Sequence, residues 1–392
     1  MRYKNAILLA LTQALGNSGA SIVVFVGGII GAEMAPSLAL STMPVSLMVV
    51  GVALATIPTA LLLRRVGRRK GYMVGAAIGF LAALFAAYAI LQASFVLFCT
   101  ATLLIGVNGA FIAQYRFGAA ESVPPKRSGQ AVSFVLLGGI AAGYLGPEIA
   151  RRTQYLLPAG PFSGTFIILA GMFAVVVALL YFLDEITPYA VDTTQPERPL
   201  GQVITQPAYL AAVISGVVAY GVMSFIMTAT PVEMHTLHGF TLEDTAFVIQ
   251  SHIIAMYLPS LLTGPLLARL GLQRVMLAGW LCLLACVGLG MVSHQLLEYW
   301  GTLVLLGMGW NFLFVGATVL LTQSYRSSER FKAQAVNDFT IFGIQAITSL
   351  TAGTVLFNAS WDTLLMLNLP VLAILLLVLL QLRRWQPATV TD

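Results

Sequence analysis

Apolar runs of about 20 residues, separated by short polar breaks, recur along the whole chain and restrict its fold more than any other feature. Of the 392 residues, 58% are hydrophobic and only 9% are charged, whereas a soluble domain carries about 25% charged residues. Backbone groups inside a bilayer must be hydrogen-bonded within each segment, so these runs are expected to be helices. The sequence lacks the alternation that a membrane barrel needs. The pattern therefore predicts an all-α integral membrane protein.

The breaks between the runs predict twelve transmembrane helices. A polar, proline-containing segment at 184–206 separates two sets of six and predicts a cytoplasmic linker. We therefore expect an N-terminal six-helix bundle over 1–183, a C-terminal bundle over 207–385 and a short tail at 386–392. The predicted spans are 6–31, 41–63, 72–91, 94–116, 129–149, 162–183, 207–230, 245–267, 275–293, 298–321, 333–356 and 362–382.

The distribution of positive charge predicts that both termini are cytoplasmic. With that orientation, only Arg151 and Arg152 of the 20 lysines and arginines fall on the outer side. Cytoplasmic loops are enriched in these residues. The net charge of +5 is thus explained by topology, and we expect membrane lipid rather than nucleic acid as its partner.

One stretch of the chain is repeated. The segment 60–70 reads ALLLRRVGRRK, 264–274 reads GPLLARLGLQR, and Gly271 follows Gly67 by 204 residues. The same offset relates Gly75 to Gly279, and also Gly139 to Gly343 and the Gln-Ala-Val runs at 130–132 and 334–336. A constant offset over about 70 residues indicates two related halves.

Twelve spans in two repeated halves, with a Gly-Arg-Arg loop after the second span, resemble the major facilitator superfamily. The family signature in that loop is G-x-x-x-D-R-x-G-R-R. Ala60 and Arg64 replace its first glycine and its aspartate, and the matching residues are Arg65, Gly67, Arg68 and Arg69, with Gly264, Arg269 and Gly271 in the second copy. The resemblance implies a monomeric transporter without a cofactor, whose bundles give alternating access to a central site.

The missing aspartate predicts a charge swap at the inner gate. In the family the aspartate faces the start of the eleventh span, where the helix dipole favours negative charge. Asp338 lies within about two turns of the start of span 333–356. We hypothesise that Asp338 is the partner of Arg64 or of a neighbouring arginine. The alternative is that Arg64 extends to the lipid headgroups.

Polar side chains inside a bilayer are costly, so their positions indicate a substrate cavity. In the superfamily, spans 3, 6, 9 and 12 form the scaffold, and the amides of this chain largely avoid them. Aromatic rings could stack on a planar solute while amides bond its edge. Each amide alone also suits a hydrogen bond between helices. The predicted cavity residues are Gln13, Asn17, Asn108, Tyr220, Gln250, His252, Tyr257, Trp310, Asn311 and Gln345.

Charged residues restrict the substrate and the coupling ion. No Lys or Arg lies at mid-span, and Arg116, near the inner end of its span, is expected to pair with Glu121. A neutral, zwitterionic or weakly charged organic solute is therefore favoured. His252 and Asp338 are the candidates for proton coupling. Three further residues, Glu233, His235 and His238, are expected in an exposed loop, where the absence of a fourth ligand predicts no metal site.

The sequence thus predicts a proton-coupled secondary transporter in a bacterial cytoplasmic membrane. Short runs at 220–223, 227–231, 248–250 and 335–338 resemble a bacterial subgroup whose roles include vitamin uptake, riboflavin in particular. The alternative is a proton-driven multidrug efflux antiporter, which the glycine-rich stretch 138–147 favours. Gln13 and Asn17, where efflux pumps often carry a membrane acid, favour uptake. A remote alternative is an integral-membrane enzyme, but the chain has no Gly-x-Ser-x-Gly, His-Glu-x-x-His or phosphate-binding loop.

Overall fold

The computed structural model describes residues 3–123, 128–158, 160–186, 198–326 and 329–385, and within these ranges the chain is helical, without strands. Eleven helices in this part are long and apolar enough to cross a membrane. The predicted span 129–149 coincides with α6 (Ser128–Thr153), a helix that is not one of those eleven. The all-α membrane fold is confirmed, and a twelfth crossing stays a prediction.

Every predicted span lies on a helix, and short helices occupy several of the breaks. The first half consists of α1 (Tyr3–Met34), η1 (Leu38–Leu40), α2 (Met43–Val66), α3 (Arg68–Leu91), α4 (Phe95–Ile112), α5 (Tyr115–Glu121), α6 and α7 (Ser163–Tyr181). The second half consists of α8 (Leu200–Ile204), α9 (Pro207–Pro231), η3 (Val232–Leu237), α10 (Leu242–Tyr257), α11 (Ser260–Leu270), α12 (Leu272–Gly290), α13 (Leu296–Thr322), α14 (Arg330–Asn358), α15 (Trp361–Met366) and α16 (Leu369–Trp385).

Three predicted spans are interrupted, and one of them, 94–116, divides into α4 and α5 at residues 113–114. The span 245–267 divides into α10 and α11 at Pro259, which lacks the backbone N–H that a continuous helix would use. The span 362–382 divides into α15 and α16, and Pro370 is the second residue of α16. Proline is tolerated in a first helical turn, where N–H groups have no partner within the helix.

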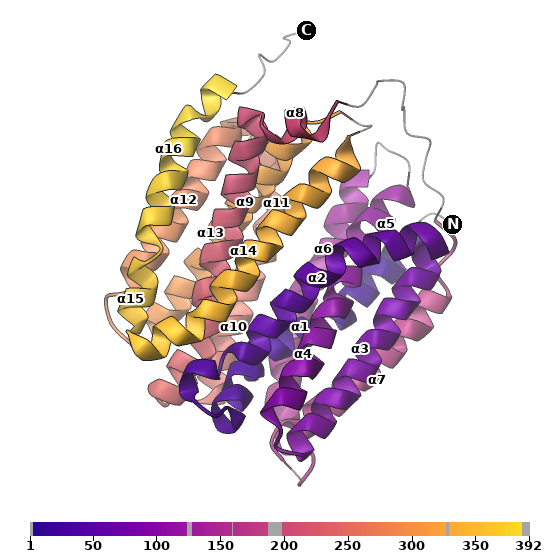
Figure 1. Ribbon diagram of the computed structural model, residues 1–392, viewed down its shortest axis with the longest axis vertical. Coiled ribbons are helices and arrows are strands. Elements are labelled where there is room, and N and C mark those ends of the chain that lie inside the picture. Colours follow the sequence, from indigo (N-terminus) through magenta and orange to yellow (C-terminus); the bar gives the residue numbers. More distant parts are fainter. Residues whose placement is uncertain (1–2, 124–127, 159, 187–197, 327–328, 386–392) are drawn as a thin grey trace.

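The two halves lie side by side, with the indigo-to-magenta helices on one side of Figure 1 and the pink-to-yellow helices on the other. In the first half α1 packs on α6, α2 on α4, and α3 on both α4 and α7. In the second half the matching helices make the same pairs, because α9 packs on α14, α10 on α13, and α12 on both α13 and α16. The pairing follows the 204-residue repeat of the sequence.

The repeat is also visible in the backbone. Gly67 joins α2 to α3 with φ 82° and ψ 163°, and Gly271 joins α11 to α12 with φ 81° and ψ 159°. This region of backbone conformation is essentially restricted to glycine. A side chain at either position would meet no atom within 4 Å, so the backbone angles, not lack of space, require glycine there.

Small residues bring the helices of the first half into close contact. A Cβ atom on Gly106 of α4 would overlap the Met48 carbonyl of α2, and one on Gly51 of α2 would overlap the Leu103 carbonyl of α4. Such close backbone approach replaces hydrophobic burial as a source of association between helices in lipid.

The bundle has two distinct ends, which we call the linker end, marked by α5 and α8, and the distal end, marked by η1 and α15 (Figure 1). Contacts between the halves gather toward the distal end. Ser46 of α2 donates to the Ser349 carbonyl of α14 at 2.7 Å, and Gln250 of α10 donates to the Tyr144 carbonyl of α6 at 3.1 Å. Gly353 of α14 packs on the α1–α2 turn without room for a side chain.

Candidate functional site

An aromatic cluster occupies the centre of the second half. Tyr220 of α9 meets Trp310 and Phe314 of α13 edge-on, with ring centroids 5.2 Å away in each case, and Phe342 of α14 at 5.6 Å. Trp310 stacks on Phe314 at 4.9 Å, and Tyr257 of α10 lies edge-on to Trp310 at 6.1 Å. Edge-on and stacked contacts are favourable arrangements of ring quadrupoles. Three predicted cavity residues, Tyr220, Tyr257 and Trp310, therefore lie together.

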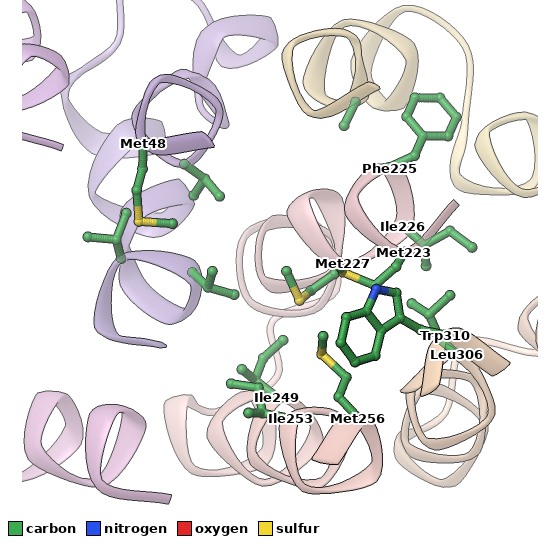
Figure 2. Packing of buried hydrophobic residues seen from close by; sticks show 14 of the residues in the cluster. Met48, Met223, Phe225, Ile226, Met227, Ile249, Ile253, Met256, Leu306 and Trp310 are labelled. Atoms are coloured by element: carbon green, nitrogen blue, oxygen red, sulfur yellow. The ribbon is translucent and has the colours of Figure 1, made fainter. Parts of the chain in front are cut away.

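Methionines surround this cluster. Figure 2 shows the Trp310 indole beside Met223, Met227 and Met256, all of which are buried. Thioether side chains are flexible and polarizable, so they can repack around different shapes. The walls beside Trp310 can therefore change shape more easily than walls built from branched side chains.

A small, partly open recess with room for about one water molecule lies between α13 and α14 beside the aromatic cluster. It is lined by Phe314, Ala317, Thr318, Leu321, Asn337 and Ile341. Small-molecule sites usually have volumes of about 300–1,000 Å³. The recess is therefore too small for an organic solute, and movement of side chains or helices must open the site.

Four predicted cavity residues have a buried polar atom without a hydrogen-bond partner among the described residues. These atoms are Oε1 of Gln13 on α1, Oδ1 of Asn108, Nε2 of His252 and Nε1 of Trp310. A buried unsatisfied polar group costs about 1–3 kcal/mol. A solute with both donors and acceptors on its edge would remove that cost. Asn17, one turn from Gln13, and Gln345 of α14 are half-buried.

Other predicted cavity residues instead join helices. Asn108 donates to the Gly75 carbonyl of α3 at 2.7 Å, and Gln250 is used in the contact with α6 described above. Asn311 donates to the Met256 carbonyl at 2.7 Å and accepts from Thr263 at 2.8 Å, which ties α13 to both sides of the α10–α11 break. The structure does not bring Asn108 or Asn311 into the aromatic cluster.

His252 has the same helix-joining role. Its Nδ1 lies 2.7 Å from the Leu303 carbonyl of α13, so Nδ1 carries the proton that makes this bond. The side chain is fully buried. The imidazole thus holds α10 on α13 within one half, while its Nε2 has no partner among the described residues.

Asp338 lies opposite a cation from the other half. The positive charge of Arg116 of α5 acts on Asp338 of α14 from beyond ion-pair distance, since no contact of 4.0 Å or less joins these two described side chains. Asn337 donates to Oδ1 of Asp338 at 3.0 Å. The positive charge of Arg116 also acts on Tyr220 and Tyr257. The pair therefore borders the aromatic cluster.

The sequence analysis missed this pair. It expected Arg116 beside Glu121 and Asp338 beside Arg64, but the side chains of Glu121 and Arg64 lie outside the described part of the structure. A signal was present, because Arg116 is the one cation in span 94–116 and Asp338 the one acid in span 333–356. Opposite lone charges in membrane segments are expected to find each other.

The signature arginines bind within the first half. Arg68 donates to the Tyr72 hydroxyl at 2.9 Å, and Arg69 donates to the Tyr181 carbonyl with its guanidinium 5.1 Å above the Tyr181 ring. Arg65 and Arg269 are exposed, and Gly264 lies within α11. A latch between these arginines and the second half stays a prediction.

Both ends of the linker are fixed by ion pairs. Lys4 of α1 binds Asp184 at 2.7 Å, and Arg198 binds Glu329, just before α14, at 2.7 Å. The Arg198 guanidinium and backbone N–H donors hold the pKa of Glu329 down at about 2. Each end of the linker is therefore attached to its own half.

This architecture, with membrane-spanning helices in duplicated pairings and an aromatic and polar centre, is that of a multi-pass membrane transporter. The chain belongs to the Major Facilitator Superfamily, whose sequence profile matches residues 7–337 and 212–391. Family membership confirms the class predicted from the loop motif and identifies the chain as a transporter rather than an enzyme.

Similar proteins cover nearly the whole chain. The riboflavin transporter RfnT of Brucella anthropi is 36% identical over 381 residues, which are 96% of this chain and 95% of that one. The uncharacterized MFS-type transporter YddS of Bacillus subtilis is 30% identical over 401 residues, 96% of this chain and 90% of that one.

Solved structures show the same fold. A bacterial homologue of the human lysosomal transporter Spinster, in an inward-facing and unoccupied conformation, superposes with a TM-score of 0.71 at 13% identity, covering 98% of this chain and 97% of that one. Its inward-facing and occupied conformation gives a TM-score of 0.73 at 13% identity, covering 98% of each chain.

Proposed function

We propose that this transporter takes up a planar, vitamin-like solute, with riboflavin as the first candidate, across a bacterial cytoplasmic membrane. The observation that carries the proposal is the 36% identity to a riboflavin transporter, which extends over 96% of this chain and 95% of the relative. The similarity therefore includes both halves and the boundary between them, where transporters of this architecture bind solute.

The chemistry of the site supports a planar solute. A flavin ring has flat apolar faces and an edge that carries both donors and acceptors. Tyr220, Tyr257 and Trp310 provide rings for its faces, and the methionines beside Trp310 can adapt to its outline. Gln13 Oε1 and Trp310 Nε1 would bond its edge from opposite halves.

The proposed transport cycle is alternating access by twelve spans, with both termini and the linker in the cytoplasm. The ion pairs of Lys4 and Arg198 at the linker end lie within each half, and the attraction between Arg116 and Asp338 crosses between the halves. The hydrogen bonds of Ser46 and Gln250 join the halves toward the distal end. These contacts favour a state closed at the distal side, with solute exchange at the linker side. Opening the distal side requires them to break.

Asp338 is the proposed proton carrier. A carboxylate in a low-dielectric site needs a nearby cation, and when the cation moves away it takes up a proton. Arg116 and Asp338 belong to different halves, so rocking of the halves changes their separation. His252 is assigned a structural role, because its bond to Leu303 lies within the second half.

The test is uptake of radiolabelled riboflavin by bacteria that neither make nor import it, with and without a protonophore. Accumulation that the protonophore abolishes is expected. Absence of riboflavin accumulation from a chain shown to be in the membrane would overturn the substrate assignment. Protonophore-sensitive exclusion of a planar dye in the same cells would change the assignment to efflux.

A further inference from the structure

A buried glutamate and two histidines meet at the distal end, outside the proposed solute site. The sequence analysis expected Glu233 in an exposed loop, but the residue is only 2% exposed. The reason is that α9 continues beyond Pro231 as the π-helical turn η3, which folds Glu233 inward and ends at Leu237, directly before His238. π-helical turns are rare and frequently occur at functional sites. His294, in the turn between α12 and α13, completes the group.

We propose that Glu233, His238 and His294 form a site for a zinc-class transition-metal ion. Oε1 of Glu233 lies 3.3 Å from Nδ1 of His238 and 3.9 Å from Nδ1 of His294. One ligand atom from each residue lies within 4.8 Å of the other two. Tetrahedral zinc with bonds of about 2.0–2.2 Å holds its ligand atoms roughly 3.3–3.6 Å apart. Nδ1 of His238 also lies 3.1 Å from the Glu233 backbone carbonyl, to which it donates, so binding through Nδ1 would replace this hydrogen bond and release its proton. Small rotations of the side chains would then bring these atoms around an ion.

The ligand types select the class of ion. Two imidazole nitrogens with one carboxylate oxygen suit zinc, whereas calcium and magnesium prefer oxygen ligands alone. Three protein ligands leave a fourth position for water. The carboxylate of Asp362, at the start of α15, also acts electrostatically on Glu233 and strengthens the preference for a cation.

Tyr299 orients the group. Its hydroxyl donates to Oε1 of Glu233 at 3.2 Å and lies 3.2 Å from Nδ1 of His294. Hydrogen bonds around a metal site position the ligands and raise affinity. The side chains of His238 and His294 are 34% and 42% exposed, while that of Glu233 is 3% exposed. An ion therefore reaches the buried carboxylate from the histidine side.

The ion would link two parts of the second half at a contact with the first. It would tie η3 to the α12–α13 turn, and Val232 of η3 packs on Gly28 of α1 so closely that a side chain at Gly28 would clash. Binding is therefore expected to stabilise the folded protein, and the stabilisation is a readout independent of transport.

The experiment is Co²⁺ titration of the purified full-length chain in detergent, after removal of any histidine tag. Zinc displacement and melting temperature are measured on the same sample. One tightly bound Co²⁺ per chain is expected, with the visible absorption of a tetrahedral ion. His294→Ala and His238→Ala should each abolish that absorption and the rise in melting temperature. Tyr299→Phe should weaken binding about tenfold.

His235→Ala is the matched control. Nδ1 of His235 contacts the Phe240 carbonyl at 2.7 Å, and the ring interacts with Glu33 of α1 rather than with Glu233. This variant should bind Co²⁺ as the wild type does. The proposal is overturned if the wild type shows no saturable binding, or if binding survives both His238→Ala and His294→Ala. Elution of each variant as a monodisperse peak separates loss of ligand from loss of fold.

Discussion

Replacing Glu329 by glutamine removes the ion pair that holds the end of the linker on the second half. The pKa of Glu329 is lowered from 4.5 to about 2, chiefly by its bonds with Arg198. At 1.36 kcal/mol per pKa unit, this shift corresponds to about 3 kcal/mol of stability at neutral pH. Because the Arg198 side chain is 26% exposed, solvent reduces the value, and we treat it as an upper bound.

The pH dependence has a definite sign. A carboxyl group whose pKa is lowered on folding stabilises the protein above its unfolded pKa. The stabilisation from Glu329 is therefore complete above about pH 4.5 and disappears as the pH falls toward 2. Glu329→Gln should lose it at every pH, so wild type and variant should converge in acid.

The assay is thermal unfolding in detergent, followed by fluorescence-detected size exclusion at pH 7 and at pH 3.5. The variant should melt several degrees lower at pH 7, and the gap should narrow at pH 3.5. Asp184→Asn is a comparison, because its ion pair with Lys4 is about half exposed on both sides and should contribute at most about 1 kcal/mol. Equal melting of Glu329→Gln and wild type at pH 7 would refute the reasoning.

Three further predictions concern the site and the repeat. Trp310→Ala should raise the KM for riboflavin uptake about tenfold, equivalent to about 1.4 kcal/mol, and Trp310→Phe should raise the KM less. An unchanged KM in both variants would exclude stacking of the solute on Trp310. Asp338→Asn should abolish protonophore-sensitive accumulation while leaving riboflavin exchange across proteoliposomes without a gradient, and retained accumulation would rule out Asp338 as the proton carrier. Gly67→Ala should destabilise the protein by about 1–3 kcal/mol because Gly67 has a φ of 82°. The control is Gly171→Ala, since a side chain at Gly171 of α7 has free space, and equal melting temperatures of the two variants would contradict the backbone argument.

Sequence patterns predicted the helices because lipid imposes a length and a composition on every span. They also predicted the repeat, and Gly67 and Gly271 have matching backbone angles at equivalent positions. The break at Pro259 carried a local signal, but the pattern could not show whether proline would bend the span or divide it. Local rules therefore predicted the fold well.

The site was less predictable because depth in a span does not fix the side of the helix. Asn108 and Trp310 lie near the middle of their spans, yet Asn108 faces α3 and Trp310 the aromatic cluster. A helix inside a bundle meets other helices on several sides, so an amide finds a partner helix as readily as a cavity. His294 was missed for a related reason, since only the fold brings it to Glu233.

The anchored linker has a consequence for how the protein can be assembled. Asp184 is bound by Lys4 and exchanges hydrogen bonds with Asn5, all within the first half, while Arg198 is bound by Glu329 in the second. No described anchor at either end depends on the opposite half. Neither end of the linker therefore needs the peptide connection between 187 and 197 to stay attached to its half. The two halves are suited to expression as separate polypeptides that recombine in the membrane through the distal contacts.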